Sequence, residues 1–136
     1  MGLFSMKSFH SFLLEENTFT DKSVKENQVF KEDQIYTYIQ KLHRNQDDFT
    51  DGDISARIEK YKQYKVETVN IEDIDIKEFD LVDEYVEDYV EELKKKKTYP
   101  PIVLAHNYQI IDGTHRANAL AELGYKKIVA FVGIKK

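Results

Sequence analysis

The stretch that decides the fold is Tyr108-Gln-Ile-Ile-Asp-Gly-Thr-His-Arg-Ala-Asn-Ala-Leu-Ala-Glu-Leu-Gly124. Ile110 and Ile111 are typical of a β-strand, and Gly113 allows a sharp turn after it. Apolar residues then recur at helical spacing until the final glycine ends the helix. The stretch therefore predicts a strand, a one-glycine turn and a helix, with Thr114 as the helix N-cap.

The start of this helix carries a basic pair, His115 and Arg116. The first amides of a helix point outward without intrahelical partners, and the helix dipole is positive at this end. Such a helix start binds anions, phosphate above all. Asp112, just before the turn, is a candidate either to hold a metal ion or to orient His115. The turn is thus predicted to be a phosphate site. The alternative interpretation is an ordinary strand-turn-helix with a surface His-Arg pair.

The segment 110–120, preceded by Tyr99-Pro-Pro-Ile-Val-Leu104 and followed by Ile128-Val-Ala-Phe-Val132, resembles the ParB/sulfiredoxin superfamily. The resemblance covers residues 64–136. In that superfamily a Gly-x-(His/Arg)-Arg turn cradles nucleotide phosphates. Its members include ParB CTP switches, sulfiredoxin, ADP-dependent free-serine kinases and ParB-like nucleases.

The resemblance implies an α+β fold, with a small mixed sheet on which helices pack. We expect helices at Leu81–Lys97 and Thr114–Leu123, strands at 64–71, Ile102–Ala105, Tyr108–Asp112 and 128–134, and a hairpin turn at His106-Asn107. Residues 64–136 would form the ParB/sulfiredoxin-like domain. Residues 1–63 would form a helical N-terminal extension, which serves as a lid, a dimer surface or a partner-binding element.

The superfamily also suggests roles for individual residues. The predicted cofactor is ATP or ADP with Mg²⁺, and the metal ligand would be Asp112. Against the free-serine kinases, the Asp112–Arg116 turn matches closely, and Glu78 falls in the place of their catalytic base, although Ile76 replaces a proline. Catalytic roles are predicted for Glu78, Asp112 and His115. Nucleotide contacts are predicted for Gly113, Thr114, His115, Arg116 and Asn118.

These roles make a nucleotide-dependent phosphotransferase or nucleotide hydrolase the first hypothesis. A ParB-like DNA-acting protein, such as a nuclease, is the second hypothesis. A nuclease would need a metal cluster, and Asp112 with Glu78 or Glu72 would supply only part of one. ParB proteins carry Gly-Glu-Arg-Arg in the turn and a helix-turn-helix domain after it, which disfavours DNA clamping here. The third is a non-enzymatic phage effector or inhibitor that binds a basic host protein through its extension or its acidic helix.

Composition narrows these hypotheses. The 136 residues, with 41% hydrophobic and 33% charged residues, suit one folded domain with a very polar surface. The chain has no cysteine, which excludes disulfides, thiolate metal sites and the chemistry of sulfiredoxin, whose reactive cysteine corresponds to Thr114. A net charge of -5 disfavours broad nucleic-acid binding. The chain lacks an apolar membrane span and a secretory signal, so we expect a cytoplasmic protein.

The N-terminal extension begins with an apolar set at helical spacing in residues 1–17, which predicts a short amphipathic helix with His10 exposed. Residues 6–16 also resemble segments of proteins packaged in the heads of tailed phages. A better helix is predicted at 30–45, with His43 on its polar side. Four apolar residues lie on its other face at the helical period: Ile35, Tyr38, Ile39 and Leu42. The aspartate-rich loop 47–53 lacks the bidentate glutamate of an EF-hand, so we interpret it as a loop with an N-cap for a helix that ends near Gln63.

The helix at 81–97 is strongly amphipathic. Its apolar residues repeat at the helical period and are predicted to be buried: Tyr85, Val86, Tyr89, Val90 and Leu93. Its acidic residues are predicted to be exposed: Glu84, Glu87, Asp88 and Glu91. Such acids are weak candidates for acid-base catalysis, because a tuned carboxylate usually requires partial burial. We interpret His106 as a turn residue.

Overall fold

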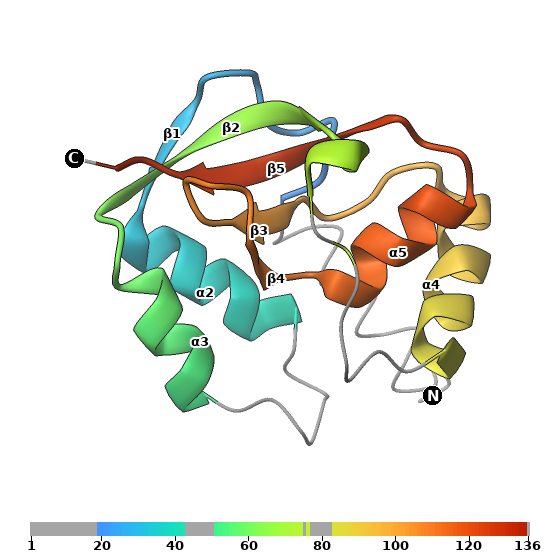
Figure 1. Ribbon diagram of the computed structural model, residues 1–136, viewed down its shortest axis with the longest axis horizontal. Coiled ribbons are helices and arrows are strands. Elements are labelled where there is room, and N and C mark those ends of the chain that lie inside the picture. Colours follow the sequence, from blue (N-terminus) through green and yellow to red (C-terminus); the bar gives the residue numbers. More distant parts are fainter. Residues whose placement is uncertain (1–18, 43–50, 75, 77–82, 136) are drawn as a thin grey trace, which may run out of the picture.

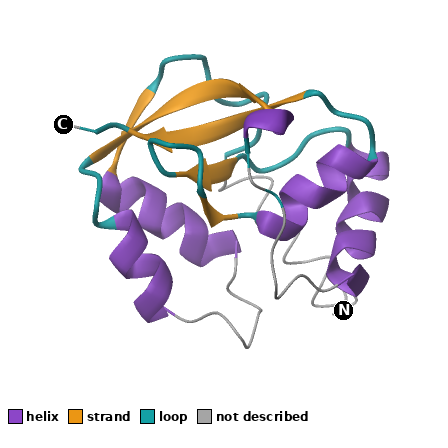
Figure 2. Cartoon of the chain, in the orientation of Figure 1, coloured by secondary structure: helices purple, strands orange, loops and turns teal. Residues whose placement is uncertain are grey.

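The computed structural model describes residues 19–42, 51–74, 76 and 83–135, with only the backbone at 51–54 and 83. Its elements, in chain order, are β1 (Val29–Lys31), α2 (Glu32–Leu42), α3 (Asp51–Ile58), β2 (Gln63–Asn70), the short 3-10 helix η1 (Ile71–Asp73), α4 (Asp83–Lys96), β3 (Ile102–Leu104), β4 (Ile110–Asp112), α5 (Thr114–Glu122) and β5 (Lys127–Gly133) (Figure 1). Helices and strands follow one another along the chain (Figure 2). None of the helices in this part of the chain is long and apolar enough to cross a membrane.

The described strands form one five-stranded sheet in the order β1-β2-β5-β3-β4. β5 lies in the middle, antiparallel to β2 and parallel to β3. Phe131 stands at the centre, opposite Val66 on one side and Val103 on the other. The sheet is therefore mixed, and the prediction of an α+β fold is confirmed.

Successive residues of β5 belong to two different cores, because side chains alternate between the faces of a strand. Phe131 belongs to the core that includes α2 and Ile58 of α3. Ala130 and Val132 belong to the core of α4 and α5. The two pairs of helices thus lie on opposite faces of the sheet, and Figure 1 shows them as separate groups, with α2 and α3 on the left.

The predicted extension takes part in this sheet through β1. Phe30 pairs with Tyr64 of β2, so α2 begins at Glu32 and not at residue 30 as predicted. The predicted inner face of that helix is confirmed, with four residues buried: Ile35, Tyr38, Ile39 and Leu42. Residues 29–42 share a core with the rest of the domain. The boundary at residue 64 remains a prediction.

The acidic face of α4 is assigned correctly, but only two of the five apolar residues predicted to be buried are buried. Val86 and Leu93 are buried, and the four acidic residues predicted to be exposed are exposed. Tyr89 and Val90 are half-buried, whereas Tyr85 is 45% exposed, so its predicted burial is wrong. α4 packs on α5, where the ring of Tyr85 meets the ring of His115 edge-on and keeps much of its surface exposed.

The C-terminal end of α5 was predicted correctly from local sequence, whereas that of α3 was not. Gly124, with φ of +93°, follows α5 as predicted. Its amide donates to the Ala121 carbonyl, and the amide of Tyr125 donates to the Leu120 carbonyl, which is the Schellman motif. The helix predicted to reach Gln63 ends earlier, at Ile58. The predictions for residues 1–17, His43, residues 47–50 and Glu78 lie outside the described residues.

Candidate phosphate-binding turn

The turn between β4 and α5 has the predicted location but a different cap. β4 ends at Asp112, Gly113 has a left-handed backbone, and α5 begins at Thr114. The Gly113 carbonyl accepts the first helical hydrogen bond from the Ala117 amide, at 2.8 Å. Gly113 is thus the N-cap, and the prediction of Thr114 is wrong. A cap requires a non-helical backbone, whereas Thr114 is already the first helical residue.

Gly113 is required here for two reasons. Its φ of +113° is one that residues with a side chain rarely adopt. A Cβ atom built on it would also lie 2.6 Å from Cγ2 of Ile102 in β3, a distance that forces a shift. The absence of a side chain therefore lets the turn lie directly against the neighbouring strand.

Arg116, in the first turn of α5, points into the protein. It is 2% exposed. Its Nε donates to the Pro100 carbonyl at 3.2 Å, and its Nη2 donates to the Pro101 carbonyl at 3.1 Å. The same Nη2 lies 3.4 Å from Oδ2 of Asp112, which is also buried. Arg116 therefore ties the start of α5 to the segment that enters β3.

The charge of Arg116 is maintained in this buried position. Burial by itself lowers the pKa of Arg116, but the charge of Asp112, with Tyr38 and Tyr89, more than offsets it, so the pKa is raised. Sequence reasoning missed both tyrosines. One signal was present for the burial of Arg116, since it lies three and four positions before Ala119 and Leu120 on the inner stripe of α5.

His115 lies at the rim of the turn, half-buried. Its ring packs edge-on against Tyr85 of α4, with the ring centroids 5.4 Å apart. Thr114 beside it is also half-buried. The basic side chain nearest the surface at the start of this helix is therefore His115, and Arg116 lies beneath it.

Asn118 joins the turn to the segment after η1. Its Nδ2 donates to the Ile76 carbonyl at 2.7 Å and to the Thr114 carbonyl at 2.8 Å. The structure thus brings together six of the predicted site residues: Asp112, Gly113, Thr114, His115, Arg116 and Asn118. Glu78, the seventh, follows Ile76 by two residues, outside the described part of the chain.

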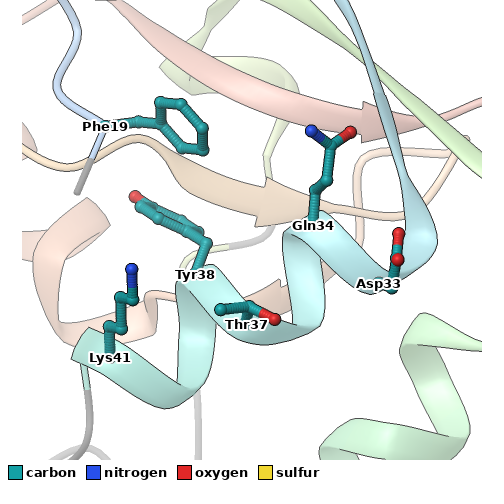
Figure 3. A pocket seen from close by; sticks show the side chains of 6 residues that line it. All are labelled: Phe19, Asp33, Gln34, Thr37, Tyr38 and Lys41. Carbon is teal, nitrogen blue, oxygen red and sulfur yellow. The ribbon is translucent and has the colours of Figure 1, made fainter. Parts of the chain in front are cut away.

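Two hollows lie away from the turn. One, of about 260 Å³, lies beside α2 and is lined by Phe19, Asp33, Gln34, Thr37, Tyr38 and Lys41 (Figure 3). The other, of about 610 Å³, lies at the starts of α2 and β2. Within the described residues, no group of three or more His, Cys, Asp or Glu side chains is placed to hold a metal ion.

Comparisons with known proteins find a matching family and similar solved structures. The ParB N-terminal domain family matches residues 55–135. One crystal form of a Pnob8-like ParB-N domain is 26% identical, with a TM-score of 0.46, over 54% of this chain and 31% of that one. A pNOB8-like ParB N-domain is 29% identical, with a TM-score of 0.39, over 51% and 27%. This chain therefore spans less than a third of either protein. A search of curated proteins finds no match.

Proposed function

Because the chain belongs to the ParB N-terminal domain family, we propose that it binds a nucleotide and holds its phosphate groups at the start of α5. The observation that carries this proposal is the turn itself. Gly113 lies against β3 without a side chain, and a nine-residue helix begins immediately after it. This arrangement presents outward-pointing amides and the positive end of a helix dipole at the end of a strand.

The side chains divide into two groups by exposure. Thr114 and His115 are half-buried, at the first two positions of α5. Arg116 and Asp112 are buried and face each other. We therefore assign phosphate contacts to the amides, Thr114 and His115. Arg116 and Asp112 hold the turn in place from beneath.

A phosphotransferase or nucleotide hydrolase acting on ATP or ADP is the proposed activity. Magnesium in such sites is held by phosphate oxygens and one or two carboxylates, so no preformed cage is required. When bound, it would neutralise charge on the transferred group. Because the carboxylate of Asp112 faces Arg116, we propose that Asp112 contributes to the site indirectly, by holding Arg116 in place. Glu78 is the proposed base, and Asn118 holds the nearby Ile76 carbonyl against α5.

The proposal is tested by the effect of nucleotides on thermal unfolding. ATP, ADP, CTP and GTP, each with and without magnesium, are compared on the full chain, and isothermal titration then gives Kd for any that stabilise it. A nucleotide at about 100 times its Kd stabilises a protein by about 2.7 kcal/mol, which is readily measured. At least one nucleotide is expected to raise the Tm.

Two histidine variants locate the binding site. His115→Ala is expected to weaken binding, because a half-buried donor beside the phosphates is removed. His106→Ala is the matched control, since it removes an exposed histidine from the β3–β4 turn, where it contacts Tyr61. Equal affinities in the two variants would place any nucleotide elsewhere. If no nucleotide binds the unmodified protein, the exposed acidic residues of α4 become the candidate surface for a basic protein partner.

A further inference from the structure

Tyr38 of α2 and Arg116 of α5 donate to the same backbone oxygen. The Tyr38 hydroxyl donates to the Pro101 carbonyl at 2.6 Å, and Arg116 Nη2 donates to it at 3.1 Å. Both contacts are buried. Tyr38 is 63 positions from Pro101 in the sequence and lies outside the segment 55–135 that matches the family. A residue of the N-terminal extension thus contacts the same carbonyl that holds Arg116 beneath the turn.

We propose that Tyr38 is a positioning residue for the phosphate-binding turn, acting through the Pro101 carbonyl and Arg116. The proposal rests on the proposed nucleotide function. The proposal gives the N-terminal extension a role in the site. Helix α2 of the extension supplies the Tyr38 hydroxyl, a hydrogen-bond donor that comes from outside the turn.

The chemistry of the three groups makes Tyr38 difficult to replace. A backbone carbonyl has two lone pairs, and here a tyrosine and an arginine each donate to it. Burial raises the pKa of Tyr38, so the hydroxyl keeps its proton and donates. Arginine can only donate, and it is already shared among Pro100, Pro101 and Asp112. A displaced Pro101 carbonyl would therefore shift Arg116, which directly follows His115.

The ring of Tyr38 is held independently of its hydroxyl. It packs against Phe19 and Phe131, with ring centroids 5.7 and 5.1 Å away. Figure 3 shows Phe19 and Tyr38 side by side at the cavity beside α2. Tyr38→Phe should therefore retain the packing and remove only the donor to Pro101.

Tyr64→Phe is the matched control. Tyr64 is buried like Tyr38, and its hydroxyl also donates to a backbone carbonyl, that of Ile58, at 2.8 Å. That carbonyl lies at the end of α3, and neither Tyr64 nor Ile58 belongs to the turn or to the Pro100–Pro101 segment that supports it. Both variants lose one buried hydrogen bond of the same kind, so their general effects on stability should be similar.

Two measurements compare these variants on the full chain. The first is the Kd of the nucleotide that binds the unmodified protein. The second is hydrogen exchange of the Ala117 amide, which makes the first helical bond to Gly113, against that of Tyr125 at the other end of α5. Tyr38→Phe is expected to raise Kd and to accelerate exchange at Ala117, each by roughly threefold to tenfold, the effect of one net hydrogen bond. Tyr64→Phe should change neither selectively.

The possible outcomes separate the two proposals. If no nucleotide binds the unmodified protein, the proposed function fails, and exchange at Ala117 still tests the role of Tyr38. If nucleotide binds but the two variants have equal Kd values and equal exchange at Ala117, the positioning role is overturned. Arg116→Lys adds a second perturbation of the same carbonyl, and its effect on Kd should not add to that of Tyr38→Phe.

Discussion

Gly113 and Gly124, at the two ends of α5, have similar backbones but different surroundings. Their φ values are +113° and +93°. A Cβ at Gly113 would meet Ile102 and the Arg116 guanidinium within about 3 Å, whereas a Cβ at Gly124 meets nothing within 4 Å. This pair separates the energetic cost of a left-handed backbone from the cost of crowding.

We therefore expect Gly113→Ala to destabilise the protein by about 3 kcal/mol or more, and Gly124→Ala by about 1 kcal/mol. Both substitutions introduce backbone strain, but only the first also forces Ile102 to move. Urea unfolding of both variants gives the two free energies. Equal losses would mean that the turn relaxes without resistance from β3.

Arg116 is expected to contribute more to stability than an exposed basic residue would, because it is buried. Arg116→Ala should cost about 3 to 5 kcal/mol, because it leaves the buried carboxylate of Asp112 without its guanidinium partner. Combining it with Asp112→Ala should restore part of that loss. The free energy of unfolding measures both effects.

An exposed ion pair provides the comparison for Arg116. Lys94 and Glu91 are 3.8 Å apart, with side chains 58% and 69% exposed. Lys94→Ala should therefore cost less than about 1 kcal/mol. If Arg116→Ala lowers the free energy of unfolding by as little as Lys94→Ala does, the buried contacts of Arg116 do not hold the turn.

Glu78 is expected to affect turnover but not binding. If the protein is an enzyme, Glu78→Gln removes the proposed base but does not alter the residues of the proposed phosphate site at the start of α5. Turnover should fall by about 10² or more, with the nucleotide Kd nearly the same. Single-turnover kinetics with titration of the same nucleotide tests this. Normal turnover in the variant would remove Glu78 from the mechanism.

At the scale of elements, α4 shows how one helix presents several degrees of burial. Val86 and Leu93 contact the core beneath, Val90 is partly covered, and Tyr85 remains exposed beside His115. The apolar stripe predicted five buried residues, but the packing of α4 buries only Val86 and Leu93 among them. Burial of an amphipathic stripe thus depends on the neighbouring element as well as on periodicity.

This gradient predicts a ranking of stability losses. Leu93→Ala should cost about 2 to 5 kcal/mol, since Leu93 is 7% exposed and its loss leaves a cavity. Val90→Ala should cost about 1 kcal/mol, because a smaller and half-buried side chain loses less apolar burial. Chemical denaturation ranks the two variants, and the reverse order would show that the packing of α4 is misassigned.

At the scale of the whole molecule, buried tyrosines link the free energy of unfolding to alkaline pH. Burial raises the pKa of Tyr99 to about 12, and it also raises those of Tyr38 and Tyr64. The unfolded chain loses these protons near pH 10, while the folded protein retains them. Stability is therefore fully present below about pH 10 and falls as the pH rises toward the folded pKa.

The expected slope is about 1.4 kcal/mol of lost stability per pH unit for each such tyrosine. Urea unfolding at several pH values between about 9 and 11.5 measures it. Tyr99→Phe is the control, because it removes one titrating group and should reduce the slope by about that amount. A variant with an unchanged slope would show that Tyr99 titrates alike in both states.

The sequence by itself determined the order and type of the elements from β2 onward, apart from the 3-10 helix η1, and also the closing glycine of α5 and the family. These features depend on local properties: periodicity, the conformational range of glycine, and a motif whose residues are neighbours along the chain. The inner face of α2 and the acidic face of α4 were predictable for the same reason. Position along a helix decides which residues share a face.

Only the tertiary structure decided what each face meets. The 3.6-residue period places Arg116 on the inner stripe of α5, but the Pro101 carbonyl and the Tyr38 hydroxyl reach it from other elements. The exposure of Tyr85 likewise depends on its neighbour in α5, the ring of His115, which it meets edge-on. Helical periodicity specifies on which side of its own helix a side chain lies. The residues that this side chain contacts, and how far they bury it, depend on how distant segments of the chain pack.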